Sequence, residues 1–302
     1  MHVFVTGASG HIGSAVIPEL IANGHTVLGL ARSDEAAAKV KALGAQVRRG
    51  DLTDPDDLAL AAAETDGVIH LAMRHDLAFS GDFAAAAASD LAAIRAIGGA
   101  LAGSDRPFVG ASGSLVLGLT RPGRVGTEQD AVSGDFPRIE AENHLIGLAD
   151  QGVRSGTVRL APTVHSDLDK HGFVPTLIGF ARKHGFSAYI GDGANRWPAA
   201  NTRDIARLYR LALERGPAGS RYHGVEGEGI PFRQIAEAIG RGAGVPARGV
   251  SVEEAPAYLG FLAAFAGVDN PMSNAWTRAT LGWEPMQPGL LDDLATGHYF
   301  EQ

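Results

Sequence analysis

A glycine-rich segment near the N-terminus has the residue types and spacing of a dinucleotide site. It reads Thr6-Gly7-Ala8-Ser9-Gly10-His11-Ile12-Gly13, follows a strand-like run and opens a helix-like one. In this context Gly7 permits a tight turn, Gly10 lets the backbone approach a pyrophosphate, and Gly13 lets the helix pack closely. The helix N-terminus adds free N–H groups and partial positive charge for the phosphates. We therefore expect dinucleotide contacts at Gly7, Ser9, Gly10, His11, Ile12 and Gly13, the alternative being a purely structural turn.

The residues after the next two strand-like runs bear on which dinucleotide binds. The second run ends at Arg32 and Ser33, where a cofactor with a free 2′-hydroxyl usually meets an acidic residue and a 2′-phosphate meets an arginine. This predicts NADP(H) in preference to NAD(H), unless Arg32 is only a solvated cation and Ser33 only a helix cap. Asp51 and Leu52 follow the third run, beside the expected adenine ring. Asp51 either accepts from the adenine amino group or caps its own turn.

The elements that must position these residues alternate between strand and helix. Strands are expected at His2–Thr6, Thr26–Leu30, Ala45–Arg49, Gly67–Leu71, Pro107–Ala111 and Val153–Ala161, with helices at His11–Ala22, Ser33–Gly44, Phe83–Leu101 and Pro137–Gln151. Short apolar strands separated by helices predict an α/β fold, a Rossmann-type doubly wound parallel sheet. Later segments favour helices: Gly172–His184, Asp204–Arg215, Pro231–Arg241, Val252–Tyr258 and Met272–Leu281.

These patterns predict two parts without a tethering linker. Residues 1–165 with about 196–227 would form the NADP-binding domain. Residues from about 166–195 with 228–302 would form a smaller, mainly helical substrate lobe.

Composition narrows the partners. The 302 residues carry a net charge of −8, which argues against nucleic acid and anionic membranes as partners. The absence of cysteine excludes disulfides and thiolate chemistry, and no metal site is expected. Neither a signal peptide nor a long uninterrupted apolar run stands out, so we expect a cytoplasmic monomer or homodimer that acts on a small molecule.

Further segments resemble landmarks of one enzyme family. They are Gly50-Asp51-Leu52, His70-Leu71-Ala72, Arg159-Leu160-Ala161-Pro162, and the run from Gly191 to Trp197 that leads to Asp204. Together with the glycine-rich segment, the chain resembles the extended short-chain dehydrogenase/reductases, also called the NAD-dependent epimerase/dehydratase family. The resemblance spans nearly the whole chain. It implies cofactor contacts at Leu71, Ala72, Met73, Arg138 and Pro162.

The chain departs from this family where catalysis is expected. The family uses a serine or threonine after the fifth strand and a Tyr–Lys pair on the next helix, yet none of the five tyrosines lies between Ser112 and Ala161. Aligned on Glu142, Arg138 takes the lysine column and Gly134 the tyrosine column, and aligned on Gly118, Gly113 takes the serine column. The resemblance then implies an atypical site. In it Ser112 or Ser114 holds a substrate oxygen, unless both only cap the turn, and Arg138 binds the nicotinamide ribose or polarises that oxygen, unless it only pairs with Glu142.

A guanidinium stays protonated near neutral pH, so the proton needs another source. His75 lies on the loop expected to face the nicotinamide, and His165 and His171 lie on the expected substrate lid. Each is a candidate acid because histidine titrates near neutrality, and water is the competing source. His70 is expected to be structural.

Two features of the sequence bear on the substrate class. In nucleotide-sugar members of the family, an arginine placed like Arg196, here followed by Trp197, clamps a diphosphate; the alternative is a salt bridge. Apolar residues such as Phe173, Phe261 and Phe265 favour an apolar pocket. We therefore expect an NADP(H)-dependent oxidoreductase that transfers hydride to or from an apolar carbonyl compound or activated alkene. A nucleotide-sugar epimerase or dehydratase and a catalytically silent NADP-binding sensor remain alternatives.

Overall fold

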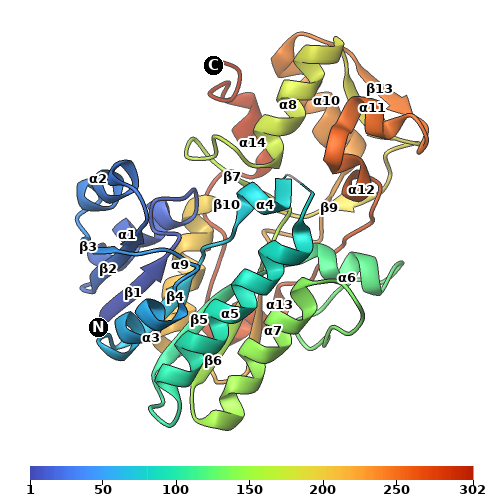
Figure 1. The fold of residues 1–302 in the computed structure, drawn as a ribbon. Coiled ribbons are helices and arrows are strands. Elements are labelled where there is room, and N and C mark those ends of the chain that lie inside the picture. Colours follow the sequence, from blue (N-terminus) through green and yellow to red (C-terminus); the bar gives the residue numbers. More distant parts are fainter. Residues whose placement is uncertain (80, 302) are drawn as a thin grey trace.

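A seven-stranded parallel sheet forms the centre of the computed structural model, which describes residues 1–79 and 81–301 (Figure 1). The strand order is β11-β6-β5-β4-β1-β2-β3. Strands β2 and β3 are added on one side of β1 and strands β4 to β6 on the other, so the order reverses between β1 and β4. The strands are β1 (His2–Thr6), β2 (Thr26–Ala31), β3 (Gln46–Arg49), β4 (Gly67–His70), β5 (Pro107–Gly113), β6 (Arg154–Leu160) and β11 (Ser220–Gly224). The predicted Rossmann-type sheet is therefore confirmed.

Helices cover both faces of this sheet. One face carries α1 (Gly13–Ala22), α2 (Asp34–Ala42) and α9 (Thr202–Arg215), which share one apolar cluster with the sheet. The other carries α3 (Pro55–Ala63), α5 (Phe83–Leu101) and α7 (Arg138–Gly147), which share a second cluster. Figure 1 shows α5 and α7 crossing in front of the strands. Shorter elements at the edge are α4 (His75–Phe79), α6 (Leu115–Thr120), the 3-10 turn η1 (Leu148–Gln151) and α13 (Ala275–Leu281).

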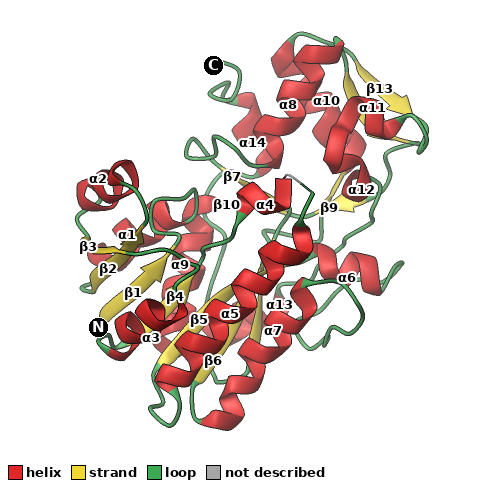
Figure 2. Ribbon diagram, viewed as in Figure 1, coloured by secondary structure: helices red, strands yellow, loops and turns green. Residues whose placement is uncertain are grey.

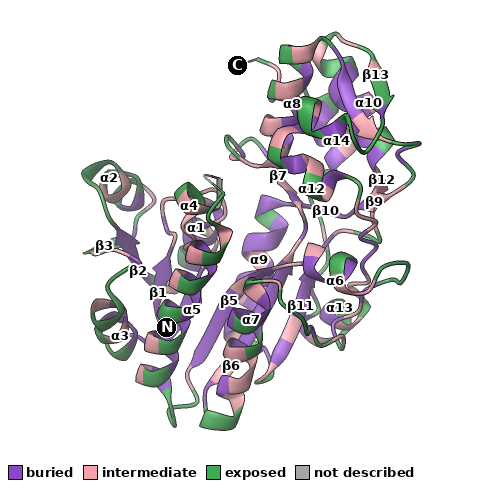
Figure 3. Cartoon of the chain, turned by 45° about the vertical axis from the view of Figure 1, so that its right-hand side comes forward, coloured by how far each residue is buried: buried purple, intermediate pink, exposed green. Residues whose placement is uncertain are grey.

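The remaining elements build a mainly helical C-terminal lobe (Figure 2). Its helices are α8 (Phe173–His184), α10 (Phe232–Ala243), α11 (Ala255–Leu259), η2 (Gly260–Leu262), α12 (Ala263–Ala266) and α14 (Leu290–Ala295). Short two-stranded pairs join β8 (Ser187–Ile190) to β13 (Ala247–Val250), β9 (Arg196–Trp197) to β12 (Ile230–Pro231), and β10 (Ala199–Asn201) to β7 (Thr163–His165). The lobe has its own apolar core, visible as buried segments in Figure 3.

Two predicted helices of this region begin later than expected. Met272 forms a bridge with Gly126, and Ser273 Oγ accepts from the Ala275 N–H at 3.2 Å, so the helix begins at Ala275. The helix expected from Val252 begins at Ala255. Met272 and α13 pack on the core of the sheet rather than on that of the lobe. The domain boundaries given above stay a proposal, and we now propose that α13 belongs with the sheet.

One helix in the described ranges, α5, is long and apolar enough by length and composition to cross a membrane. Half of its apolar window is buried inside the protein, where it packs between α3 and α7. The burial is that of a core helix covering a sheet.

Candidate active site

The three glycines of the N-terminal turn meet different steric limits. Gly7 has φ +65°, and a Cβ there would lie 2.8 Å from the backbone nitrogen of Ala72. A Cβ on Gly13 would lie 2.3 Å from the Gly7 carbonyl oxygen, too close for any side chain. Gly10 is exposed, and its N–H donates to the Gly7 carbonyl at 3.0 Å, which closes the turn. The turn is thus shaped by backbone approaches that only glycine permits.

The N-terminus of α1 is open. No side chain caps it, and its first turn holds no acidic residue. Ser9, His11 and Ile12 are partly exposed around this end. A helix end without a cap or an acid keeps its partial positive charge and its free N–H groups, which suits a bound phosphate.

At the end of β2, Arg32 is exposed and no ion pair or side-chain hydrogen bond of it is found within the described chain. Ser33 caps α2, where its hydroxyl accepts from the Ala36 N–H at 3.1 Å. Asp51 caps its own turn, since Oδ1 accepts from the N–H and hydroxyl of Thr53 at 2.9 and 2.8 Å. These bonds, followed by the charge of Arg32, lower the pKa of Asp51. Leu52 is buried in the core.

Arg138 is the first residue of α7 and reaches the carboxyl ends of two strands. Its Nη2 donates to the carbonyl of Ala111 on β5 at 2.7 Å, and its Nη1 donates to the Met73 sulfur, after β4, at 2.8 Å. The expected alternative, an ion pair with Glu142, is wrong. Glu142 instead accepts from the buried Arg159 at 3.2 Å, because both side chains lie in the sealed space between α7 and β6.

The two candidate serines differ in their surroundings. Ser114 is fully buried, and its hydroxyl accepts from Asn270 Nδ2 at 2.9 Å. Ser112 is buried, and its hydroxyl makes no hydrogen bond of good geometry to a described residue. Between them, a Cβ on Gly113 would meet nothing within 4 Å. Gly134, in the tyrosine column, has φ +125° and only Ile139 within that distance. Space is therefore open at Gly113 and Gly134, the two positions that the sequence alignment assigns to the family's hydroxyl residues.

His75, the first residue of α4, is exposed, and Arg138 is close enough to act on it electrostatically. Packing against neighbouring atoms, and then the positive charge of Arg138, lower the pKa of His75. His165 lies elsewhere than expected: it belongs to β7 and is fully buried, with Nδ1 2.8 Å from Asp293 Oδ2. The expectation that His165 lies on the substrate lid is wrong, because His165 is a buried residue of β7, whereas His171 lies exposed in the segment between β7 and α8.

His11 of the glycine turn is tied to the segment that precedes α8. Its Nε2 lies 2.7 Å from the Thr202 hydroxyl, and its Nδ1 lies 3.8 Å from Asp169 Oδ1. Asp169 also accepts from the Gly172 N–H at 2.8 Å and from the Tyr299 hydroxyl at 3.3 Å. The glycine turn and the C-terminal lobe therefore share one partly buried polar network.

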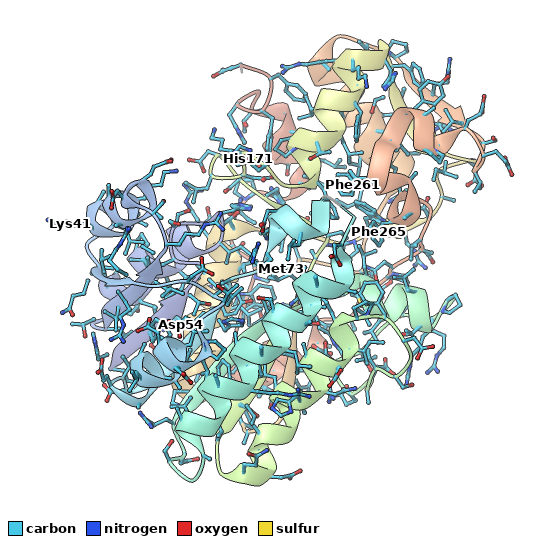
Figure 4. The ribbon with its side chains drawn as sticks, in the orientation of Figure 1. Lys41, Asp54, Met73, His171, Phe261 and Phe265 are labelled. Carbon is cyan, nitrogen blue, oxygen red and sulfur yellow. The ribbon has the colours of Figure 1, made fainter. Side chains whose placement is uncertain are left out.

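The lobe side of the site is apolar and its arginine is already engaged. Arg196 donates from Nε and Nη2 to Asp269 at 3.0 and 2.8 Å. Trp197 is fully buried between Phe173 and Phe232. In Figure 4, Phe261, Phe265 and His171 lie on the lobe side of α4, and Met73 lies on the sheet side. Pro162 is partly exposed just before β7.

Sequence reasoning missed Asp90, whose carboxylate lies 3.3 Å from Arg138 Nη2. The signal was an aspartate on the apolar face of the Ala-rich helix α5, flanked by buried Ala87 and Leu91. It also missed Asp169 and Tyr299, whose partners lie far apart in the chain. No cluster of three or more His, Cys, Asp or Glu side chains able to hold a metal ion occurs in the ranges described.

Comparison with known proteins agrees with this geometry. Residues 3–223 match the model of the NAD dependent epimerase/dehydratase family. The chain is 45% identical to "Uncharacterized protein C2A9.02" of Schizosaccharomyces pombe, over 99% of this chain and 100% of that protein. It is 28% identical to a 2-alkyl-3-oxoalkanoate reductase of Stenotrophomonas maltophilia, over 99% of this chain and 91% of that one.

Solved structures share the fold. A dTDP-glucose 4,6-dehydratase from Streptomyces venezuelae, solved with NAD bound, superposes with a TM-score of 0.77 at 19% identity, over 100% of this chain and 97% of that one. Fold, glycine turn and family model thus agree, and the chain belongs to the NAD dependent epimerase/dehydratase family.

Proposed function

We propose that this protein is an NADP(H)-dependent oxidoreductase that transfers hydride to or from an apolar carbonyl compound or activated alkene. The observation that carries the proposal is the position of Arg138. Its planar donor group lies between Met73 and Ala111, at the carboxyl ends of β4 and β5, on the sheet edge that also holds the glycine turn. In open α/β sheets, ligands bind at this edge, where the strand order reverses.

The preference for NADP(H) is supported by the end of β2. Arg32 is exposed there and is not committed to a carboxylate within the described residues, so its guanidinium is free to meet a 2′-phosphate. Ser33 is used as the cap of α2 and adds less to this proposal than Arg32 does.

The apolar substrate is supported by what the lobe offers. Arg196 is held by Asp269 through two side-chain hydrogen bonds, so a diphosphate would have to displace a carboxylate. Phe173 and Phe261 pack against each other at 6.2 Å between ring centres, and Phe265 lies on the same side. The reductase relative acts, by its name, on an alkylated oxoalkanoate. These features favour an apolar ketone over a nucleotide sugar.

The proposed roles follow from the contacts. When bound, the nicotinamide supplies or accepts the hydride. Arg138 and the buried hydroxyl of Ser112 hold the oxygen or the nicotinamide ribose as hydrogen-bond donors. The proton comes from His75, which is exposed near Arg138, or from a water molecule. Ser114 is committed to Asn270 and is assigned a supporting role.

One observation favours a second candidate, a catalytically silent NADP-binding sensor. Gly113 and Gly134 stand at the serine and tyrosine columns, so the side chains that usually touch the substrate oxygen are absent. A sensor would bind NADPH without consuming it.

The test is steady-state NADPH oxidation across a panel of alkyl and aryl ketones. The matched control is Gly10→Val, in which a branched side chain on the exposed turn blocks the pyrophosphate approach. We expect ketone-dependent oxidation by the wild type and neither binding nor oxidation by Gly10→Val. NADPH binding without oxidation of any ketone would favour the sensor.

A further inference from the structure

A buried chain of polar side chains runs from the strand before the glycine turn to Arg138. Thr6 Oγ1 lies 2.8 Å from His70 Nδ1, and His70 Nε2 lies 3.1 Å from Asp90 Oδ1. Asp90 Oδ2 lies 3.3 Å from Arg138 Nη2. Thr6, His70 and Asp90 are each at most 1% exposed. The chain thus crosses from β1 through β4 and α5 to α7 beneath the candidate site.

The proton positions along this chain follow from donor and acceptor counts. The N–H groups of Leu71 and Ala72 both donate to Thr6 Oγ1, at 3.2 Å each, which occupies both lone pairs of the hydroxyl. The hydroxyl proton is then donated to His70 Nδ1, which places a proton of His70 on Nε2, the atom that faces Asp90. Asp90 therefore faces the Nε2–H of His70 on one side and the guanidinium of Arg138 on the other.

Within the described residues, the ion pairs of the buried Asp90 carboxylate are with His70 and Arg138. Burial opposes its ionisation, but the charge of Arg138 and the hydrogen bond from His70 outweigh burial and lower the pKa of Asp90. Asp90 does not cap its helix, because Asp82 accepts from the Ala85 N–H at the start of α5. Its carboxylate therefore faces the guanidinium of Arg138 through Oδ2 and the imidazole of His70 through Oδ1.

Some hydrogen-bond donors of Arg138 lack a strong acceptor within the described chain. Its Nη2 donates to the Ala111 carbonyl and lies at ion-pair distance from Asp90, whose Oδ2 accepts no hydrogen bond within the described chain. Its Nη1 donates to the sulfur of Met73, a weak acceptor. Its Nε is buried and has no acceptor in the described chain. A guanidinium anchored on one side and unsatisfied on the other is preorganised to donate to a ligand oxygen.

We propose that Asp90, oriented by His70, is the positioning residue that fixes Arg138 for binding the nicotinamide ribose or the substrate oxygen. The two residues then act as one unit at the place where the family has its Tyr–Lys pair. This inference rests on the proposed function, which gives Arg138 its ligand. Asp90 itself touches neither cofactor nor substrate.

The test is a double-mutant cycle on NADPH affinity, with Asp90→Asn, Arg138→Lys and the double variant. Asp90→Asn keeps the size of the side chain and the acceptor for His70 but removes the charge. Arg138→Lys keeps the charge but loses the fork. We expect each single variant to weaken NADPH binding at least tenfold. The NADPH affinity of the double variant should lie within twofold of that of the single variant that binds NADPH less tightly. Losses that multiply would overturn the proposal.

Glu214→Gln is the matched control. Glu214 also lies between a histidine and an arginine, His25 and Arg210, each at 2.9 Å, but near the C-terminal end of α9, at the far edge of the sheet. Its substitution should leave NADPH affinity within twofold of the wild type. If it weakens binding as much as Asp90→Asn does, the effect of Asp90 is general destabilisation and the proposal fails.

A second readout separates this inference from the proposed function. NMR exchange of the Arg138 Nε–H should be at least tenfold faster in Asp90→Asn than in the wild type, with or without NADPH. A wild type that binds no NADPH would refute the proposed function. Unchanged Arg138 exchange, or NADPH affinity unchanged in a folded Asp90→Asn, would refute the positioning role. If Asp90→Asn does not fold, Asp90→Glu keeps the charge but displaces it, and normal NADPH affinity in that variant refutes the role.

Discussion

His11 and Asp169 meet where the glycine turn touches the C-terminal lobe, with Nδ1 3.8 Å from Oδ1. Burial, and then the charge of His165, lower the pKa of His11 to about 4. Burial raises the pKa of Asp169 to about 6. Folding therefore shifts both side chains towards their neutral forms.

The two shifts give opposite pH dependences of stability. Asp169 holds its proton more tightly when folded, so its contribution is present below about pH 4 and lost as the pH rises to about 6. His11 holds its proton less tightly when folded, so its contribution is present above about pH 6.5 and lost as the pH falls to about 4. Each amounts to about 3 kcal/mol at 1.36 kcal/mol per pKa unit, and they nearly cancel.

Replacing one of the two residues should reveal the pH dependence of stability that the other contributes. From pH 4 to 7, Asp169→Asn should gain free energy of unfolding relative to the wild type, and His11→Gln should lose it. Urea unfolding at four pH values measures both. Differences from the wild type that are flat, or of the same sign, would show that these groups are not shifted as described.

Arg32→Ala should weaken NADPH binding at least tenfold, about 1.4 kcal/mol, and leave NADH binding within twofold. The reason is that only NADPH carries the 2′-phosphate. Lys39→Ala is the control, because Lys39 is an exposed cation on α2 paired with Glu35 at 2.8 Å. Titration of both nucleotides into both variants checks this, and an unchanged NADPH/NADH ratio in Arg32→Ala contradicts it.

Arg196→Ala should leave NADPH affinity and ketone turnover within twofold of the wild type. Its ion pair with Asp269 is about one-third exposed on both sides, so its loss should cost ~1 kcal/mol or less. Asp269→Asn is the paired control for stability. If the wild type binds a UDP- or dTDP-sugar and Arg196→Ala abolishes that binding, the nucleotide-sugar alternative replaces ours.

Gly113→Ser should be tolerated and should raise kcat/KM for a ketone about tenfold. Open space surrounds the new Cβ, so the free energy of unfolding should stay within ~1 kcal/mol of the wild type. The added hydroxyl would donate to the substrate oxygen. Gly113→Ala is the control that adds a Cβ without a hydroxyl. An equal gain in kcat/KM in both variants, or unfolding of both, would show that the site is placed wrongly.

The sequence predicted the sheet because local patterns determine it. Each buried strand and each amphipathic helix is indicated by the hydrophobic pattern of consecutive residues, and the glycine spacing indicates the turn. Helix α3 was missed although Asp54 and Pro55 are a cap and a first helical residue, with Asp54 accepting from the Asp57 N–H at 3.1 Å. The short elements of the lobe lack such signals, because their positions depend on packing.

The candidate site was less predictable because its contacts are distant in the chain. Arg138 was found by its column, but its partner Asp90 lies on another helix. Glu142, four residues from Arg138 in the sequence, was the wrong partner, because its carboxylate accepts hydrogen bonds from Arg159 and Arg221. His165 was misplaced because a three-residue strand buries it against Asp293.

The most direct test of the account is the fate of the hydride. NADPH deuterated at C4 of the nicotinamide, supplied as each C4 epimer in turn, is incubated with the wild-type protein and an apolar ketone, and the alcohol is analysed by mass spectrometry. We predict that one epimer delivers one deuterium to the carbinol carbon and that Arg138→Lys slows this transfer at least tenfold. Ketone reduction without deuterium in the alcohol from either epimer, or no reduction of any ketone by a wild type that binds NADPH, would contradict the account.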